Sequence, residues 1–306
     1  MAPQAKAKPT VDDNLATKEV MVYYHAANRR VFQGSVWIRN VPGALAGASA
    51  ELARSGANLV ATSSSNISNT DLAQWAFFAE AGDGWAGPEK TQEMLEGSPG
   101  VVRSVLKEGI DGMVVDDLHY PLRLITGEPA MVMSRKTFRD MLDRLLAVFG
   151  SGGRAIIYEL GLASGIEDYK HFVRIFGNKD LIRRIPDLVS LYTAYGWGRA
   201  EKAGGTRPAF SVRPFRGIVR LYDSFECSGI SAKTPNSDFL RGHLEGFAQT
   251  LTGETIKCKE TKCISTGDAY CQFDCREEVV SPDTPAPWKS EVWENLSSKS
   301  LNKTTG

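Results

Sequence analysis

The sequence predicts an α+β protein with two domains, and three observations carry this prediction. The chain has 306 residues, enough for two separate cores, and its content of 42% hydrophobic and 24% charged residues is that of a globular protein. Strand and helix signals alternate from Arg30 to about Leu118 in the order strand, helix, strand, strand, helix, strand. A second series of signals begins at Gly127 and runs to about Glu278.

The first series opens with a strand over residues 31–38, and a helix follows it. Residues 40–43 read Asn-Val-Pro-Gly, a sequence that caps a helix. The apolar residues Leu45, Ala48 and Leu52 then recur three and four positions apart, so one face of this helix is predicted to be buried. A Gly-Ala-Asn segment ends the helix.

Two more strands, a second helix and a last strand complete this series. Residues 59–67 and 73–81 predict a pair of strands around a Ser-Asn-Thr-Asp turn. Residues 88–95 predict the second helix, and residues 101–107 predict the fourth strand.

This order of elements, with Asn40-x-Pro42-Gly43-x-Leu45 leading into the first helix and Asn58-Leu59 after it, resembles the ACT domain. ACT domains are ferredoxin-like regulatory modules that commonly bind amino acids. The resemblance implies a ferredoxin-like βαββαβ domain over residues 30–120, preceded by an N-terminal extension over residues 1–29.

The second series opens with an amphipathic helix. Its apolar residues recur at helical spacing and form one face, namely Phe138, Met141, Leu142, Leu145, Leu146 and Phe149. A Ser-Gly-Gly segment breaks this helix, and residues 155–158 predict a buried strand. Helices over residues 170–176 and 181–192 follow, and then a strand pair between residues 210 and 227.

The segment from Phe239 to Phe247 predicts a helix with spaced glycines, and the next strand ends in Glu260-x-x-Cys263. A Gly-Asp turn follows, and Cys271 opens the last strand. This arrangement resembles the C-terminal half of the 4-vinyl reductase domain, a family of small-molecule-binding modules. The resemblance implies a mixed α/β ligand-binding domain over residues 127–278. The Pro-rich and polar residues 279–306 predict a flexible tail.

A carboxylate and several thiols surround the Gly-Asp turn, and both groups are zinc ligands. Resemblance to the phenol-sensing members of the family implies a zinc site that includes Glu260, Cys263 and Cys271. The family's fourth ligand is a cysteine at the start of the preceding helix, where this chain has Ser237. A hydroxyl is a poor zinc ligand, so the zinc prediction needs another fourth ligand.

The candidates for the fourth zinc ligand are Cys275, Cys227, Cys258 and a water molecule. Strand alternation puts Glu260 and Cys263 on opposite faces, so a shared site requires a bulge at residues 261–262. The alternative left open is a cluster of reduced thiols packed in the core.

The resemblance also implies a pocket for a small hydrophobic or aromatic ligand. The residues expected to line it are Leu221, Tyr222, Phe225, His243, Phe247 and Cys258. Each of them could equally be an ordinary core residue. The phenol sensors have a tryptophan at the position of Leu221 and an aromatic residue at that of Cys258. Phenol itself is therefore not expected, and a larger or more apolar ligand stays open.

Composition narrows the function classes. Lysine plus arginine equals aspartate plus glutamate, 36 against 36, so no net field draws the chain to nucleic acid, and no direct nucleic-acid binding is expected. No apolar run reaches membrane-spanning length, and the first residues lack the apolar core of a secretory signal, so a cytoplasmic location is predicted. In that reducing setting, five cysteines favour metal ligands or buried thiols over disulfides.

The leading functional hypothesis is a regulatory protein that senses a small hydrophobic molecule without turnover, acting as a homodimer because both resembled families commonly dimerise. No catalytic residues are assigned, since no acid/base or nucleophilic arrangement is visible, nor a dinucleotide-binding loop or iron–sulfur spacing. Two alternatives stay open. One is an accessory protein or enzyme of tetrapyrrole metabolism, as in bacteriochlorophyll-type vinyl reduction, and the other is an assembly or tethering adaptor.

Overall fold

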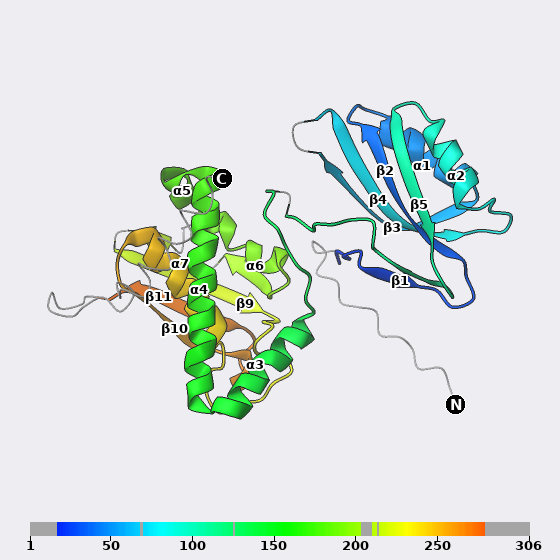
Figure 1. The fold of residues 1–306 in the computed structure, drawn as a ribbon. Coiled ribbons are helices and arrows are strands. Elements are labelled where there is room, and N and C mark those ends of the chain that lie inside the picture. The colour runs from blue at the N-terminus through cyan, green and yellow to red at the C-terminus, as the bar shows by residue number, and fades with distance from the viewer. Residues whose placement is uncertain (1–16, 68–69, 125, 203–209, 213, 279–306) are drawn as a thin grey trace, which may run out of the picture. The chain divides into compact units, whose positions relative to one another are not determined.

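The structure is a computed structural model that divides into two compact units, one ending at Met131 and the other beginning at Val132. Each unit is described by itself below, with the element labels of Figure 1. The residues that the structure describes are 17–67, 70–124, 126–202, 210–212 and 214–278. The predicted tail over residues 279–306 lies outside them.

The N-terminal unit is built on a four-stranded antiparallel sheet with the strand order β3-β4-β2-β5. Its strands are β2 (Val31–Arg39), β3 (Ala57–Asn66), β4 (Leu72–Ala81) and β5 (Val101–Glu108). The helices α1 (Ala44–Arg54) and α2 (Pro88–Glu96) connect them and lie together on one face of the sheet (Figure 1). This βαββαβ order and the antiparallel pairing agree with the predicted α+β fold class.

Alternation along the strands decides which residues form the core of this unit. On β4, Trp75 and Phe77 are buried against the helices, because residues two apart share one face of a strand. Leu52 of α1 and Leu95 of α2 pack against the same face. Phe32 of β2 stacks on Trp85 with ring centroids 4.5 Å apart.

Two details of the first helix differ from the prediction. The residue before α1 is Gly43, which has φ 89° and makes no capping bond through a side chain, so the Asn-Val-Pro-Gly segment does not cap the helix in the predicted way. The buried positions are Ala44, Ala48 and Leu52, whereas Leu45 is 38% exposed. The apolar face is therefore a strict four-residue repeat.

The predicted N-terminal extension contains a strand. Strand β1 (Tyr23–His25) pairs with β6 (Met113–Val115) in a separate two-stranded sheet. Gln33 of β2 donates hydrogen bonds through Nε2 to the carbonyl of Val115, at 2.7 Å, and to Asp117. Strands of three residues are too short to produce a periodic signal, so the sequence pattern did not reveal them.

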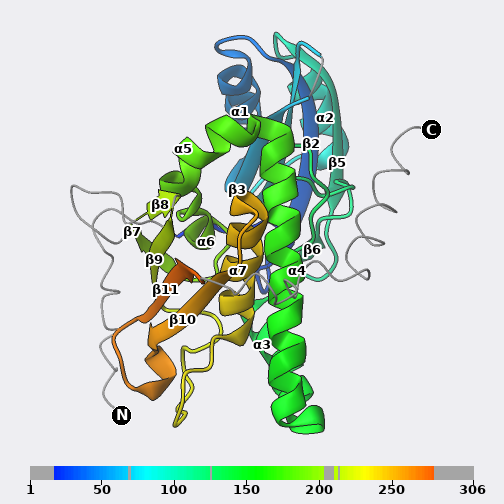
Figure 2. The ribbon, with the colours of Figure 1, turned by 90° about the vertical axis from the view of Figure 1, so that its left-hand side faces the viewer.

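The C-terminal unit has three layers: an antiparallel sheet with the order β10-β11-β9-β7, then α7, then the long helix α4 (Figure 2). Strand β8 also pairs with β9. Its helices are α3 (Arg135–Phe149), α4 (Ser151–Phe176), α5 (Asn178–Leu188), α6 (Leu191–Ala194) and α7 (Asp238–Thr252). Its strands are β7 (Arg199–Lys202), β8 (Phe210–Val212), β9 (Phe215–Tyr222), β10 (Ile256–Lys262) and β11 (Cys271–Glu277).

The buried strand predicted over residues 155–158 is wrong, because these residues belong to α4. A short apolar run does not distinguish a strand from a buried helix segment. Gly150, with φ 55°, ends α3, and Gly153 lies inside α4 where a Cβ would come within 2.7 Å of the carbonyl oxygen of Leu145. The glycines therefore allow two helices to approach closely and do not break the chain into a strand. The predicted helix over residues 170–176 is the end of the same α4, and β7 was not predicted.

The expectation that the cysteines form no disulfide is wrong for one pair, since Cys258 and Cys275 are joined by a disulfide. They lie directly opposite each other on β10 and β11, a register that composition does not reveal. The bulge predicted at residues 261–262 is confirmed, because the pairing of β10 with β11 shifts between Glu260 and Lys262.

Across the residues that are described, no helix is both long and apolar enough to span a membrane. The predicted cytoplasmic location stays a prediction.

Candidate functional site

The candidate site of the C-terminal unit is organised by the crossing of α4 and α7, where the two backbones touch. A Cβ added to Gly165 would lie 2.0 Å from the carbonyl oxygen of His243. A Cβ on Gly242 would lie 2.1 Å from that of Tyr158, and Gly161 and Gly246 are equally tight. Only glycine fits these four positions, so the crossing point of the helices is fixed by their sequence.

This crossing brings three polar side chains into a hydrogen-bonded chain. Asp168 lies one helical turn after Gly165, and its Oδ2 is 3.1 Å from Nε2 of His243. Nδ1 of His243 is 2.9 Å from the hydroxyl of Tyr192, which comes from α6. His243 is 5% exposed and Tyr192 is 7% exposed, so both ends of the His243–Tyr192 bond are shielded from water. Burial also raises the pKa of the Tyr192 hydroxyl far above its ordinary value.

A cavity opens beside this hydrogen-bonded chain. It encloses about 690 Å³, counting the part open to solvent, and lies among α4, α5, α6, α7 and the strands β9 and β11. Most of its lining is aliphatic or aromatic, for example Phe172, Val219 and Leu251. The side chains with a polar group are Asp168, Tyr192, Tyr195, Trp197 and His243. Such a lining fits an apolar molecule with one polar contact.

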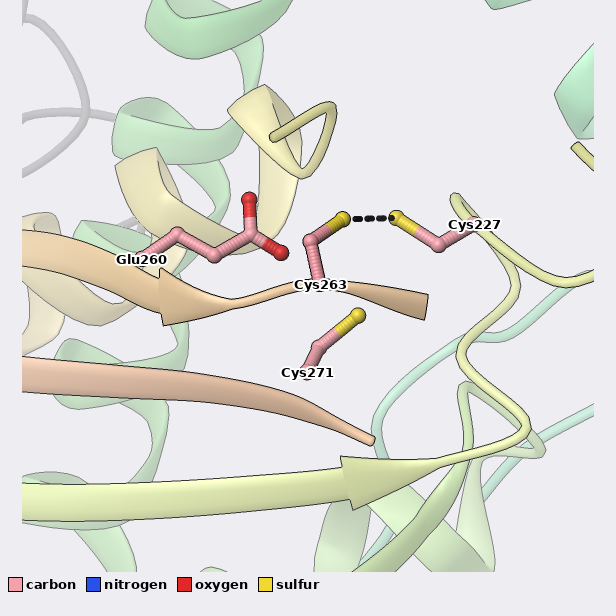
Figure 3. Close-up of side chains that lie close together, drawn as sticks. All are labelled: Cys227, Glu260, Cys263 and Cys271. Carbon is pink, nitrogen blue, oxygen red and sulfur yellow. Dashed lines mark hydrogen bonds between the residues drawn. The ribbon is translucent and has the colours of Figure 1, made fainter. Parts of the chain in front are cut away.

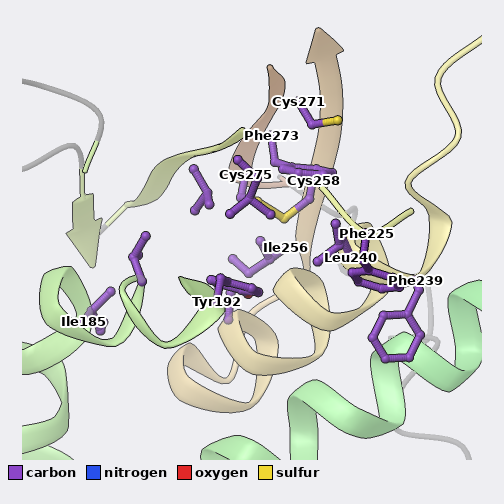
Figure 4. Close-up of a cluster of buried hydrophobic side chains, with 14 of the residues drawn as sticks. Ile185, Tyr192, Phe225, Phe239, Leu240, Ile256, Cys258, Cys271, Phe273 and Cys275 are labelled. Atoms are coloured by element: carbon purple, nitrogen blue, oxygen red, sulfur yellow. A yellow bond between two sulfur atoms is a disulfide. The ribbon is translucent and has the colours of Figure 1, made fainter. Parts of the chain in front are cut away.

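Two of the six residues predicted to bind a ligand line this cavity, namely His243 and Phe247. Leu221, Phe225 and Cys258 are buried in the same hydrophobic core but are not among the lining residues. Figure 4 shows Phe225 and Cys258 within this core. On β9, the residues that line the cavity are Phe215, Gly217 and Val219.

The strand register explains the placement of Leu221, since it lies opposite Cys271 and thus beside the thiol cluster described below. Tyr222 alternates to the other face of β9, where its hydroxyl donates to Glu201 at 2.8 Å.

Four side chains form a second site at the end of β10, namely Cys227, Glu260, Cys263 and Cys271 (Figure 3). One potential ligand atom from each lies within 4.8 Å of all the others. The bulge after Glu260 turns its carboxylate and the Cys263 thiol to the same side. The Sγ atoms of Cys227 and Cys263 are 3.4 Å apart. This group is called the thiol cluster.

Of the candidates for the fourth position, the structure brings in Cys227, from the loop after β9, while Cys258 and Cys275 are held in their disulfide. Ser237 adjoins the thiol cluster at the start of α7. Its Oγ donates to Glu260 at 2.7 Å, and its backbone N–H donates to the same carboxylate at 3.1 Å. Ser237 therefore orients Glu260 from the position where the resembled family has a cysteine.

Burial and mutual contacts shift the pKa values of the side chains in the thiol cluster. Burial raises the pKa of Glu260 to about 8. The hydrogen bond with Cys263 raises the pKa of Cys227 to about 12, and contacts with Cys227 and Cys263 raise that of Cys271. Hydrogen bonds with Cys227 and Cys271 lower the pKa of Cys263.

The donor set of the thiol cluster fits a tetrahedral dication. Three sulfurs and one carboxylate oxygen are ligands that zinc takes in closed structural sites, where ligand atoms are separated by about 3.5–4 Å. The four ligand atoms all lie within 4.8 Å of one another, which is somewhat wider than that geometry.

Sequence reasoning missed Asp168 and Tyr192. Neither stands in a motif, and their contacts with His243 join residues 75 and 51 positions apart. One signal was available, since Gly161 and Gly165, like Gly242 and Gly246, are spaced by four residues and so line one face of each helix.

Comparison with known proteins identifies part of this unit. Residues 218–277 match the family profile of the vinyl-4-reductase domain. The match covers β9 to β11, which include the thiol cluster and part of the cavity lining. It confirms the predicted 4-vinyl reductase resemblance for these residues, whereas the ACT-like assignment of the N-terminal residues stays a prediction.

A curated relative, protein MJ1642 of Methanocaldococcus jannaschii, is 28% identical over 95 residues, which are 31% of this chain and 53% of the relative. The chain thus spans about half the length of that relative. Among solved structures, the phenol-responsive sensory domain of the transcription activator PoxR with phenol is similar at 18% identity, covering 56% of this chain and 84% of that domain, with a TM-score of 0.41. A vinyl-4-reductase family protein from M. jannaschii is similar at 19% identity, covering 49% and 99%, with a TM-score of 0.29.

Proposed function

We propose that the C-terminal unit binds a small apolar molecule in its cavity without changing it chemically, and that the protein acts as a ligand sensor. The observation that carries this proposal is the apolar cavity next to a buried hydrogen-bonded chain, in the unit whose residues 218–277 match the vinyl-4-reductase domain. The mostly apolar lining of this cavity suits an aromatic or aliphatic molecule.

Binding accounts for the polar residues of the cavity better than catalysis does. Both ring nitrogens of His243 are already bonded, one to Tyr192 and one to Asp168, so the imidazole is not poised as a free base. Conversion of a vinyl tetrapyrrole by the purified protein with a reductant would instead support the alternative of a tetrapyrrole enzyme.

The thiol cluster is proposed to hold a structural zinc ion, with Cys227 as the fourth ligand beside Glu260, Cys263 and Cys271. Four protein ligands close a tetrahedral site and leave no position for a substrate. When bound, the ion would supply the positive charge that three thiolates and a carboxylate need in a buried setting.

Ligand binding is expected to stabilise the fold, and a bulky residue in the cavity is expected to abolish the effect. A ligand at about a hundred times its dissociation constant adds about 2.7 kcal/mol to the free energy of unfolding, which a thermal-shift screen of apolar compounds detects. Val219→Trp fills the cavity from β9 and should remove the shift. Ile218→Trp, on the outward face of the same strand, is the matched control and should retain it. A screen without any hit on the wild type contradicts the sensor proposal.

The N-terminal unit is proposed to be an ACT-like regulatory module through which the protein forms a homodimer. Both edge strands of its sheet, β3 and β5, present unpaired backbone groups among the described residues, and α1 carries the exposed Leu45. Leu45→Glu is expected to weaken dimerisation at least about tenfold in sedimentation experiments, because a buried unpaired charge costs more than 1.4 kcal/mol. Leu160→Glu, at an exposed position of α4, is the control. Equal dimer affinity in wild type and Leu45→Glu would place the interface elsewhere.

A further inference from the structure

Asp168, His243 and Tyr192 form a hydrogen-bonded chain that ends at the wall of the cavity. Asp168 is partly open, with 30% of its side chain exposed, whereas the side chain of His243 is 6% exposed. Tyr192 is buried and lines the cavity. Polar groups shielded in this way are costly unless their hydrogen bonds are complete, so the remaining bonding capacity of Tyr192 matters for whatever occupies the cavity.

The hydrogen positions on His243 are assigned from its two hydrogen-bond partners. An ionised carboxylate only accepts hydrogen bonds, so Nε2 of His243 bears the proton that is donated to Asp168. In the neutral imidazole the other nitrogen is then an acceptor. With this tautomer, the 2.9 Å contact between Nδ1 and the Tyr192 hydroxyl is a hydrogen bond donated by Tyr192. In this arrangement the hydroxyl hydrogen of Tyr192 is donated to His243, so the oxygen has only lone pairs left for a further hydrogen bond. Toward the cavity it can accept a hydrogen bond but not donate one.

The negative charge of Asp168 also favours a neutral hydrogen-bond donor as the ligand. The carboxylate of Asp168 lies at the end of the hydrogen-bonded chain that is farther from Tyr192. Tyr195 also lines the cavity, and its pKa is raised to about 12 by burial and by the carboxylate of Asp168. A second anion entering this poorly solvated space would be repelled. The aromatic rings of Trp197 and Tyr192, whose centroids are 5.7 Å apart and whose planes are tilted by 58°, offer instead an apolar surface beside the acceptor.

We propose that the hydroxyl oxygen of Tyr192, held by His243 and Asp168, is the polar anchor of the cavity and selects neutral apolar ligands that carry a hydroxyl group over the corresponding carboxylates. This inference rests on the proposed ligand-binding function and adds the chemistry of the preferred ligand. Tyr192 contacts the ligand, while His243 and Asp168 act as positioning residues through it.

Three probes of the same ring system separate the anchor from the cavity itself: naphthalene, 2-naphthol and 2-naphthoate. Naphthalene reports only the apolar walls. In the full-length wild-type protein, 2-naphthol is expected to bind about 3- to 10-fold more tightly than naphthalene, the gain of one hydrogen bond to a buried acceptor. 2-Naphthoate is expected to bind more weakly than naphthalene. Calorimetry or probe fluorescence gives the three dissociation constants.

Tyr192→Phe removes only the hydroxyl and is expected to abolish the preference for 2-naphthol while leaving naphthalene affinity within about twofold. Tyr270→Phe, on the turn before β11, is the matched control and should keep the preference. Asp168→Asn keeps the size of the side chain and removes its charge, so the affinity for 2-naphthoate relative to 2-naphthol should rise. A merely structural role of these residues would lower the melting temperature without changing these ratios.

The outcomes distinguish the two proposals. If naphthalene binds the wild type but 2-naphthol gains nothing, or if Tyr192→Phe keeps the preference for 2-naphthol, the anchor is refuted while the binding function stands. Tighter binding of 2-naphthoate than of 2-naphthol to the wild type refutes it as well. If none of the probes binds and no other apolar compound shifts melting, the binding function fails and the anchor fails with it.

Discussion

Replacing Cys271 with serine is expected to remove zinc from the purified protein and to destabilise the C-terminal unit more than any other single substitution proposed. Cys271 opens β11 and, with Cys227, Glu260 and Cys263, completes the thiol cluster. A structural zinc site contributes its binding energy directly to folding, about 10–16 kcal/mol in small zinc-binding peptides, so losing one thiolate ligand costs a large share of that stability. Metal analysis by mass spectrometry and melting with and without a chelator measure both effects.

The expected loss in zinc affinity can be bounded from below. Removing a residue that only orients a metal ligand typically costs about 10- to 100-fold, and removing the ligand itself should cost more. Ser237→Ala tests the lower value, because Ser237 holds the carboxylate of Glu260 without being proposed as a ligand. Zinc retention is also expected to weaken as the pH falls. Burial raises the pKa of Glu260 to about 8 when no metal is bound, so zinc must displace protons near neutral pH.

A double variant, Cys258→Ser with Cys275→Ser, is the control for the zinc prediction. It also removes cysteine sulfur from the same sheet, but from the disulfide and not from the thiol cluster, and it should keep one zinc per chain. Purified wild-type protein without stoichiometric zinc, together with unchanged melting of Cys271→Ser, would contradict the zinc proposal and favour a cluster of reduced thiols.

The parts of the fold that sequence predicted well are those set by neighbours in the chain. The strand predicted over residues 73–81 and the helix predicted over residues 88–95 each agree with the structure to within one residue at either end. The bulge after Glu260 followed from strand parity together with the assumption that Glu260 and Cys263 share one site. Strand pairing did not follow in the same way, and the disulfide between Cys258 and Cys275 depends on a register that local signals do not carry.

Only the part of the candidate site that lies within one short sequence motif could be predicted from the sequence. Glu260, Cys263 and Cys271 stand in one short segment, and the structure brings their ligand atoms together. Cys227 could not be chosen among the alternatives, because its approach to Cys263 depends on the path of the loop after β9. The buried chain through Asp168 depends on where two helices cross, which is a property of their packing.

Replacing Gly165 with alanine is expected to destabilise the C-terminal unit by about 3 kcal/mol, the upper end of the range for overpacked cores. For a unit of this size the loss lowers the melting temperature by roughly 6–12 °C. The added Cβ would lie 2.0 Å from the carbonyl oxygen of His243. A backbone carbonyl on a helix has no rotamer to escape into, so α4 must move away from α7.

The sign of this effect is informative, because helix propensity alone favours alanine over glycine by about 1 kcal/mol. Gly152→Ala on the same helix is the matched control. Its Cβ would have only one neighbour, the Cβ of Phe149 at 4.0 Å, so this variant should be neutral or slightly stabilising in urea denaturation. If Gly165→Ala proves as stable as Gly152→Ala, the close crossing of α4 and α7 is wrong. The geometry that brings Asp168 to His243 and places Tyr192 at the cavity wall would then also be wrong.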